Sequence, residues 1–328
     1  MKINDKKLLK GGSLAGTYLI NTSEGEYVRK EISLKTNREY GYQRWYSQLK
    51  RLQRYEVLFP DLFPRVLRFG EEGGNAYFDI EYFPEALNCF DYLKNYAKED
   101  TIKRIFDLIV EGMNLLHSVK IQSCADSIRL YHREEITQKL EDCWGNRAFK
   151  EYALTSTVDF QGHKVPSLYS MLTEYEEFGA RCYHELPQVE ESYTHGNITL
   201  ENILYCPQTN KVVFIDPYEE NIIDNKYNEY SQLLQSCSSH YEIFNEASPE
   251  NYDNLSIPRG IQIFNDLFTT FLKDHLSPEE LKVVRYFEAS QFVRMLPFKI
   301  KVAPLKAFLF YGVASFLVHN LLSDSSEK

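Results

Sequence analysis

The stretch SYTHGNITLENILYCPQTNKVVFIDPYEEN, residues 192–221, carries the most specific pattern in the chain. One loop brings together His195 and the two amides Asn197 and Asn202, and Asp216 follows at the end of the apolar run VVFID. Magnesium prefers hard oxygen ligands and takes few of them from protein. An Asn from a loop and an Asp from a strand end are therefore what a magnesium ion bridging two phosphates requires, although Asp216 alone could be a simple turn residue.

Three weaker signals precede this stretch in the order that phosphoryl transfer from a nucleotide needs. Gly12 and Ser13 lie in a glycine-rich turn before a strand, where backbone amides can approach phosphates. Lys30 follows in the strand-like run YVRKEIS, and Glu39 on the next helix is a candidate to orient it. Taken singly, the glycines would be a plain hairpin and the two charged residues would be solvent-exposed. Only their joint order favours a phosphate site.

This order resembles the aminoglycoside phosphotransferase and choline kinase branch of the protein-kinase-like fold, whose signature is H-G-D-x-x-x-x-N followed by a short hairpin and I-D. The resemblance covers roughly residues 10–235. HGNITLENILY…FIDP is also similar to bacterial members found with capsule and surface-polysaccharide genes. The resemblance implies an α+β, two-lobed fold, with a small β-rich nucleotide-binding lobe over residues 1–84 and a larger, mainly helical lobe over residues 85–328.

The resemblance also implies roles for the nucleotide side of the site. The turn at Gly12 and Ser13 would cover the phosphates of ATP. Lys30 would contact those phosphates, and Glu39 would orient Lys30. The main chain from Glu81 to Phe83 would join the lobes and hold the adenine.

On the catalytic side, His195 would brace the loop while Asn202 and Asp216 hold Mg²⁺. The base position of the family is Asp, but here it is Asn197, whose neutral amide cannot accept the acceptor's proton. Loss of a general base costs about 10²- to 10⁴-fold in rate. We therefore expect this form to be catalytically impaired.

Three explanations of Asn197 remain open. It could be an introduced Asp-to-Asn change, or the mark of a natural pseudokinase that binds nucleotide and acts as a regulatory or binding protein. Alternatively a neighbouring carboxylate does the acid–base work, with Glu201, Asp224 and Asp216 as the candidates in the region.

The arrangement along the chain favours a small acceptor over a protein. The first eighty or so residues read β-β-α-β, and helical patterns dominate after Pro84. About seventy-five residues separate the helix ending at His117 from His195, whereas in protein kinases the catalytic loop follows soon after. The insertion, about 119–191, is expected to be mostly helical and to form the acceptor pocket, with a sugar or sugar derivative as the favoured acceptor. No A-P-E motif follows Asp216.

Composition limits the partners. The net charge of −10 argues against nucleic acid, because phosphate backbones are held by clustered Lys and Arg. The six cysteines are scattered singly, which is typical of reduced thiols in a cytoplasmic protein. The apolar run over residues 308–322 is shorter than the about twenty residues of a bilayer span, so we expect a buried final helix and no transmembrane segment. Nothing in the sequence indicates the oligomeric state.

Overall fold

The computed structural model describes most of the chain in two compact units that are each discontinuous in sequence. The described residues are 3–9, 15–36, 40–95, 98–121, 127–186, 190–218, 221–248, 252 and 255–326. The first unit, here the sheet unit, comprises Met1–Asp91, Leu108–Leu116 and His195–Asn221. The second, the helical unit, comprises Tyr92–Asp107, His117–Thr194 and Ile222–Lys328. The units do not follow a single cut in the chain, and the lobe boundary at residue 84 stays a prediction.

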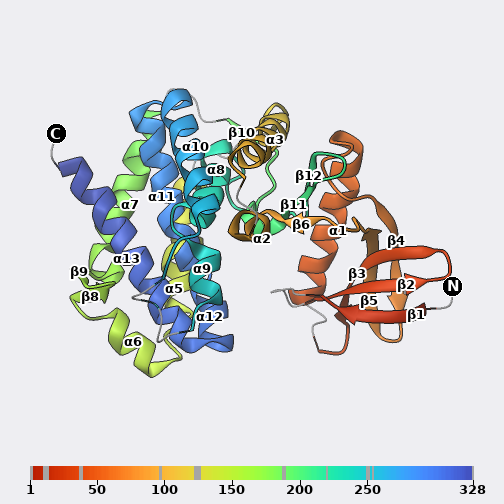
Figure 1. Ribbon diagram of the computed structural model, residues 1–328. Coiled ribbons are helices and arrows are strands. Elements are labelled where there is room, and N and C mark those ends of the chain that lie inside the picture. The colour runs from red at the N-terminus through yellow and green to blue at the C-terminus, as the bar shows by residue number, and fades with distance from the viewer. Residues whose placement is uncertain are drawn as a thin grey trace. The chain divides into compact units, whose positions relative to one another are not determined.

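The strands form one five-stranded antiparallel sheet and three small ones (Figure 1). The large sheet has the order β1-β2-β3-β5-β4, and the others are β12-β11-β6, β10-β7 and β8-β9. The strand bounds are β1 Ile3–Leu8, β2 Gly16–Thr22, β3 Gly25–Ser33, β4 Val66–Glu72, β5 Asn75–Glu81, β6 Leu87–Asn88, β7 Lys120–Ile121, β8 Thr157–Phe160, β9 His163–Pro166, β10 Glu191–Ser192, β11 Ile203–Cys206 and β12 Lys211–Phe214.

Helices make up most of the remainder. Their bounds are α1 Tyr40–Leu58, α2 Cys89–Asn95, α3 Glu99–His117, α4 Ser127–Tyr131, the π-helix η1 His132–Thr137, α5 Gln138–Glu141, α6 Arg147–Ala153, α7 Leu168–Glu185, the 3₁₀-helix η2 Leu200–Asn202, α8 Lys226–Cys237, α9 Tyr241–Glu246, α10 Arg259–His275, α11 Pro278–Arg294, α12 Leu296–Val302 and α13 Pro304–Ser326.

The large sheet contains the three strands of the expected β-β-α-β order and adds two others. β2 and β3 pair from Gly16↔Glu31 to Thr22↔Gly25 as a hairpin, and β5, which follows α1, pairs with β3. The expected order β-β-α-β is nevertheless incomplete, because β1 and β4 were not predicted. Both are outer strands of the sheet, and neither INDKKL nor VLRFGEE shows clear apolar alternation.

Helix α1 supplies the core of the sheet unit. Its apolar residues recur at helical spacing, and Trp45, Leu49 and Leu52 are all buried. The indole of Trp45 lies 5.7 Å from the ring of Phe78 on β5, centroid to centroid. The face of the sheet that carries Phe78 is therefore packed against α1. Lys30 lies on that same face, because it pairs with Phe78 across β3 and β5.

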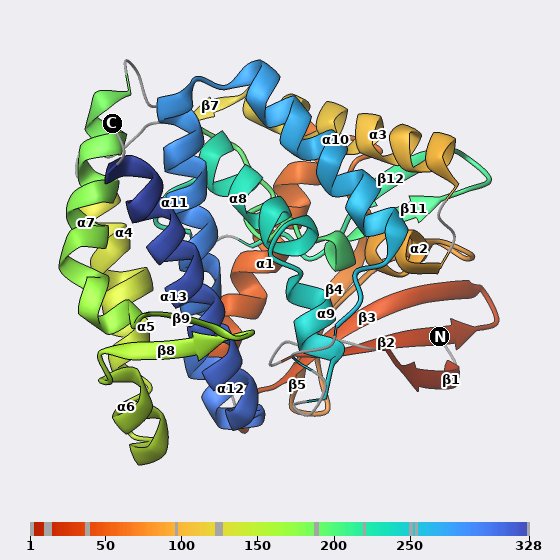
Figure 2. The same ribbon diagram turned by 60° about the vertical axis from the view of Figure 1, so that its left-hand side comes forward.

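The helical unit is built around α11. A capping box starts this helix, with Ser277 accepting from the Glu280 N–H and Glu280 accepting from the Ser277 N–H, and Pro278 lies in the first turn. Buried residues follow on every side of α11, which packs against α7, α8 and α13 (Figure 2). The segment expected to be mostly helical between 119 and 191 also contains the β8–β9 hairpin and a π-helix, so that expectation is only partly right.

The final helix packs within the helical unit. Pro304–Asp324 is long and apolar enough to cross a bilayer by length and composition, yet 56% of its most apolar window is buried inside the protein. Phe310, Tyr311 and Ala314 are fully buried. The core helix of a soluble protein has the same properties, so this helix is weak evidence for a membrane span.

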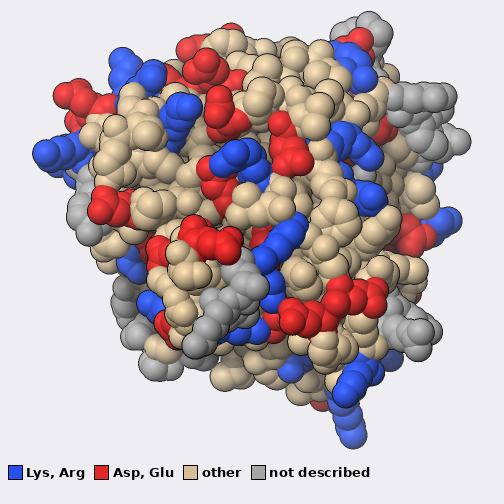
Figure 3. Space-filling model, turned by 90° about the vertical axis from the view of Figure 1, so that its right-hand side faces the viewer, with Lys and Arg blue, Asp and Glu red and all other residues tan. Residues whose placement is uncertain are grey.

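On the face shown in Figure 3, acidic and basic side chains are interspersed.

Candidate functional site

The sheet unit brings Lys30 and Asp216 into direct contact. Lys30 projects from β3, where its side chain is 4% exposed, and its Nζ lies 2.5 Å from Asp216 Oδ1. The Asp216 side chain keeps 34% exposure. An ammonium on a strand and a carboxylate from a loop almost two hundred residues later in the sequence therefore meet at one point, with the carboxylate still open to solvent.

The segment after β12 directs Asp216 to this position. Asp216 has a φ of 59°, a left-handed conformation that Asp adopts more readily than most residues. The preceding N–H, of Ile215, donates to the carbonyl of Asn202 at 2.9 Å. This hydrogen bond ties the backbone next to Asp216 to the other residue expected at the magnesium.

Asn202 is held at the end of the short helix η2. Its side-chain Nδ2 donates to the main-chain carbonyl of Asn197 at 2.9 Å, and its own N–H donates to Thr199 at 3.0 Å. With Nδ2 used in this way, the side-chain Oδ1 is the atom that Asn202 can offer to a cation. An amide oxygen is one of the hard ligands that magnesium accepts.

His195 lies under the loop and bonds through both ring nitrogens. It is fully buried, Nε2 contacts the carbonyl of Ile215 at 2.7 Å, and Nδ1 accepts the N–H of Asn197 at 3.2 Å. Burial lowers the pKa of His195 to about 4, with Arg51 contributing in the same direction. His195 is therefore neutral at physiological pH, donates from Nε2, and links the loop to the strand end that precedes Asp216.

Gly196 is required by the close packing of the loop. It has a φ of 79°, and a Cβ added there would lie 2.3 Å from the Tyr218 carbonyl and 2.5 Å from Asn221 Nδ2. The Asn221 amide donates to the Gly196 carbonyl at 3.2 Å. A side chain at position 196 would collide with the segment that contains Tyr218 and Asn221 and would displace it.

Asn197 is exposed, and its main chain is fixed at both polar groups. The N–H donates to His195 Nδ1, and the carbonyl accepts from Asn202 Nδ2. Of the other carboxylates considered as a base, Asp216 already contacts Lys30. Asp224, in the helical unit, accepts a hydrogen bond from Thr194 Oγ1 at 2.6 Å. Each of these two carboxylates therefore has a partner in the structure.

The donor set fits magnesium better than a transition metal. Among the described residues there is no cluster of three or more His, Cys, Asp and Glu side chains that could hold a metal ion. The site instead offers Asn202 Oδ1 and the Asp216 carboxylate, both hard oxygens. Magnesium in nucleotide sites uses one or two carboxylates with phosphate oxygens and water, which matches so small a set.

Part of the predicted nucleotide contact set can be placed. Glu81 ends β5, its N–H donates to the Arg65 carbonyl at 3.0 Å, and its carboxylate pairs with the Arg65 guanidinium at 3.1 and 3.2 Å. The Phe83 carbonyl accepts from Ala86 N–H at 3.3 Å in the turn that follows. Gly12, Ser13 and Glu39 lie outside the described residues. The roles of all five in holding nucleotide stay predictions.

Two further side chains support the loop and were not predicted. Gln48 on α1 donates to the carbonyl of Pro217 at 3.4 Å, and the Arg44 guanidinium lies over the Tyr218 ring, 5.0 Å from its centroid. Both lie at polar positions of the amphipathic pattern of α1, where polar residues are common. Nothing in their spacing distinguishes them in the sequence.

Comparison with known proteins gives structural but not sequence relatives. No protein-family model matches the chain, and no curated protein matches it in sequence. A spectinomycin phosphotransferase, APH(9)-Ia, solved with ADP and spectinomycin, superposes with a TM-score of 0.56 at 11% identity, covering 100% of this chain and 95% of its own. The GDP complex of an aminoglycoside 2′-phosphotransferase-IIIa F108L mutant gives 0.56 at 15% identity, covering 100% and 93%.

At these identities the likeness establishes the fold alone. The β-rich N-terminal sheet, the mostly helical remainder and the full-length superposition agree with the fold class expected from the sequence. This chain therefore has the protein-kinase-like fold seen in the aminoglycoside phosphotransferases.

Proposed function

We propose that this protein is an ATP- and Mg²⁺-dependent phosphotransferase that acts on a hydroxyl of a small molecule, and that Asn197 impairs it. The observation that carries the proposal is the contact between Lys30 Nζ and Asp216 Oδ1 at 2.5 Å, with Asn202 held on the same loop. A buried ammonium and a partly exposed carboxylate are in contact, and the Asn202 main chain is bonded to the residue before that carboxylate, which supports a phosphate and magnesium site.

Each residue has a defined task in this chemistry. Lys30 would contact and neutralise the phosphates, and its burial keeps the ammonium pointed at one place. Asp216 and Asn202 would hold the magnesium, which neutralises developing charge on the transferred group. His195 positions the loop by bonding both the Asn197 N–H and the Ile215 carbonyl.

The ligands of the structural neighbours support the proposal that this protein binds a nucleotide and a small acceptor. One was solved with ADP and spectinomycin, and the other is a GDP complex of an aminoglycoside phosphotransferase. We extend this to a sugar or sugar-derived acceptor, in a cytoplasmic protein associated with capsule or surface polysaccharide. One neighbour holds ADP and the other holds GDP, so ATP and GTP should both be tested as phosphate donors.

A second candidate is a pseudokinase that binds nucleotide and acts on partners. Asn197 favours it, since an amide cannot take a proton from the acceptor hydroxyl. The same residue allows a clean separation of the two candidates. Its side chain is exposed and its main chain is fixed by His195 and Asn202, so replacing it should leave the loop in place.

The test is turnover of ATP and GTP by Asn197→Asp against a panel of free sugars, choline and aminoglycosides. We expect Asn197→Asp to raise turnover with one acceptor by about 10²- to 10⁴-fold, the usual contribution of a general base. Asn197→Ala is the matched control and should stay at the low rate. Magnesium-dependent nucleotide binding without turnover in any variant would favour the regulator, and no magnesium-dependent thermal shift would refute both.

A further inference from the structure

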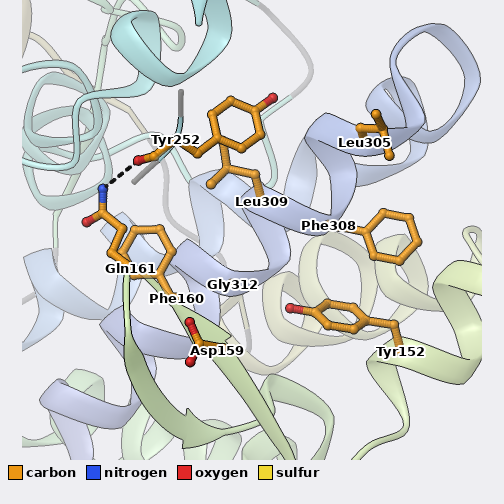
Figure 4. A pocket seen from close by; sticks show the side chains of 9 residues that line it. All are labelled: Tyr152, Asp159, Phe160, Gln161, Tyr252, Leu305, Phe308, Leu309 and Gly312. Atoms are coloured by element: carbon orange, nitrogen blue, oxygen red, sulfur yellow. Dashed lines mark hydrogen bonds between the residues drawn. The ribbon is translucent and has the colours of Figure 1, made fainter. Parts of the chain in front are cut away.

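An aromatic cavity lies in the helical unit, among residues that take no part in the candidate phosphotransfer site. It has a volume of about 290 Å³ and opens to solvent between the β8–β9 hairpin, α6 and α13 (Figure 4). Four rings line it, those of Tyr152, Phe160, Tyr252 and Phe308. Such a volume is at the small end of ligand sites and suits a molecule of about ten heavy atoms.

The rings are held by packing behind the cavity wall. Tyr152 and Phe308 lie 5.1 Å apart, and Phe308 also meets Phe149 at 5.5 Å. On the other side, Phe160 lies 5.5 Å from Phe316, all between ring centroids. These contacts fix the orientation of the rings before any ligand arrives, which reduces the entropy cost of binding.

One carboxylate, that of Asp159, lies among the described lining residues, at an exposed position of β8. It lines the cavity close to Tyr152 and Phe160 (Figure 4), and its Oδ1 accepts the Gly162 N–H at 3.1 Å. Burial raises the pKa of Tyr152, and the charge on Asp159 adds to the effect, so the carboxylate acts on this wall of the cavity.

The lining residues that the structure describes include no Lys, Arg or His. Lys164 is opposite Asp159 in the β8–β9 register, but within the described part of the chain the two form no ion pair. Among the described residues, the hydrogen-bond partner of the Asp159 carboxylate is therefore the Gly162 N–H. Rings present negative faces, so they and the carboxylate attract the same kind of ligand.

We propose that this cavity binds a small organic cation with an apolar body, such as a quaternary or aryl-alkyl ammonium ion. The cationic group would lie against the ring faces near Asp159, and the apolar part would fill the remaining volume beside Leu309. An ammonium over aromatic rings gains about 0.5–2 kcal/mol, or about two- to thirtyfold in affinity. A neutral molecule of the same shape would gain only from burial of its apolar surface.

The test is calorimetric titration of the full chain with benzyltrimethylammonium, without nucleotide. Benzyl alcohol and benzoate are the neutral and anionic comparison ligands. We expect the cation to bind about two- to thirtyfold more tightly than benzyl alcohol, and benzoate to bind more weakly than benzyl alcohol. Because no nucleotide is present, the result does not depend on the proposed phosphotransferase function.

Two variants assign the binding to this cavity. Asp159→Asn keeps an oxygen for the Gly162 N–H but removes the charge, and should weaken the cation about two- to fivefold without affecting benzyl alcohol. Gly312→Ala adds a methyl group to the cavity floor, 3.5 Å from Phe160, an ordinary contact that leaves the helix intact and should weaken every ligand.

Three results would overturn the proposal. They are equal affinity for the cation and benzyl alcohol, unchanged cation affinity in both variants, and no detectable binding at about 20 mM cation to protein that still unfolds cooperatively. Affinity about 10 mM or tighter is expected, because a cation–π site of this size provides a few kcal/mol.

Discussion

Arg29 and Lys30 are neighbours on β3, and each forms an ion pair on a different face of the sheet. Arg29 pairs with Asp79 through two bonds, Nε–Oδ1 at 2.7 Å and Nη2–Oδ2 at 2.9 Å. Asp79 also accepts from Arg68 and is fully buried. Among the described residues, Lys30 instead pairs with Asp216 at 2.5 Å, and that carboxylate stays 34% exposed.

The difference separates a structural ion pair from one suited to ligand binding. Two guanidinium groups occupy the oxygens of Asp79, and hydrogen bonding to Asp79 raises the pKa of Arg29. No ligand could reach this carboxylate without breaking the pair. Within the described part of the chain, Asp216 pairs with Lys30 and remains partly exposed to solvent, which is what a metal ligand needs. Burial and the number of partners, more than the presence of opposite charges, distinguish the two pairs.

The largest expected effect on stability comes from breaking the buried Arg29–Asp79 pair. Asp79→Asn removes the buried counter-charge of Arg29 and Arg68 and leaves buried Arg29 with the exposed carboxylate of Glu72 at 3.7 Å. It should lower the free energy of unfolding by about 3–5 kcal/mol. Urea denaturation followed by circular dichroism measures this change. The matched control is Glu31→Gln on the same strand, which removes the more exposed pair between Lys6 and Glu31 and should cost less than about 1 kcal/mol. Equal losses in the two variants would contradict the distinction.

The next largest effect is the pH dependence of stability that His195 causes. The pKa of His195 is lowered from 6.5 to about 4 in the folded protein, so below pH 6.5 the unfolded chain takes up a proton that the folded chain does not. The contribution of His195 to stability is complete above pH 6.5 and declines by about 3 kcal/mol between pH 6.5 and 4.

The measurement for His195 is an NMR titration of its ring protons. Nearby carboxylates also titrate below pH 5, so a stability curve alone would mix their effects with that of the histidine. A midpoint close to 6.5 would show that the ring is not buried against Phe63 and Phe214 as the structure has it.

A smaller effect is expected where the loop turns. Gly196→Ala adds a Cβ at a φ of 79°, within 2.3 Å of the Tyr218 carbonyl, and should cost about 1–3 kcal/mol of stability. Nucleotide affinity should fall as well, since the loop also holds Asn202. Gly145→Ala is the control, because a Cβ there meets no atom within 4 Å. Thermal unfolding of both variants, with and without Mg·ATP, tests the prediction.

The smallest effect on stability is expected for Lys30→Met. The side chain keeps its apolar stem and loses the ammonium, and removing one partner of an exposed carboxylate should change the free energy of unfolding by less than about 1 kcal/mol. The thermal shift caused by Mg·ATP should be lost. A loss of stability as large as that of Asp79→Asn would mean that the two ion pairs are of the same kind.

The candidate site could be predicted where chemistry and spacing coincide. His195, Asn202 and Asp216 lie in one stretch with a recognisable order. In the structure Lys30 contacts Asp216, and the main chain of Ile215, next to Asp216, bonds both His195 and Asn202, while the roles of these residues stay predictions. The fold class followed from the change from strand to helix patterns near Pro84. In both cases local residue types carried the information.

Long-range features could not be predicted in this way. Strands β1 and β4 are outer strands of the sheet, and without clear apolar alternation the sequence gives no sign of them. The Arg29–Asp79 pair joins residues fifty positions apart that look like ordinary surface charges. The aromatic cavity likewise combines residues from distant parts of the helical unit.

The discontinuity of the sheet unit has a consequence for the order in which the chain can fold. Its last segment, His195–Asn221, is synthesised more than a hundred residues after Asp91. At about 5–20 residues per second, the large sheet would emerge from the ribosome on the order of ten seconds before β11 and β12 could form their own sheet with β6. Until then, the ammonium of Lys30 has no Asp216 to meet, and a nascent chain or a fragment ending near residue 84 would carry half of the site without the other half.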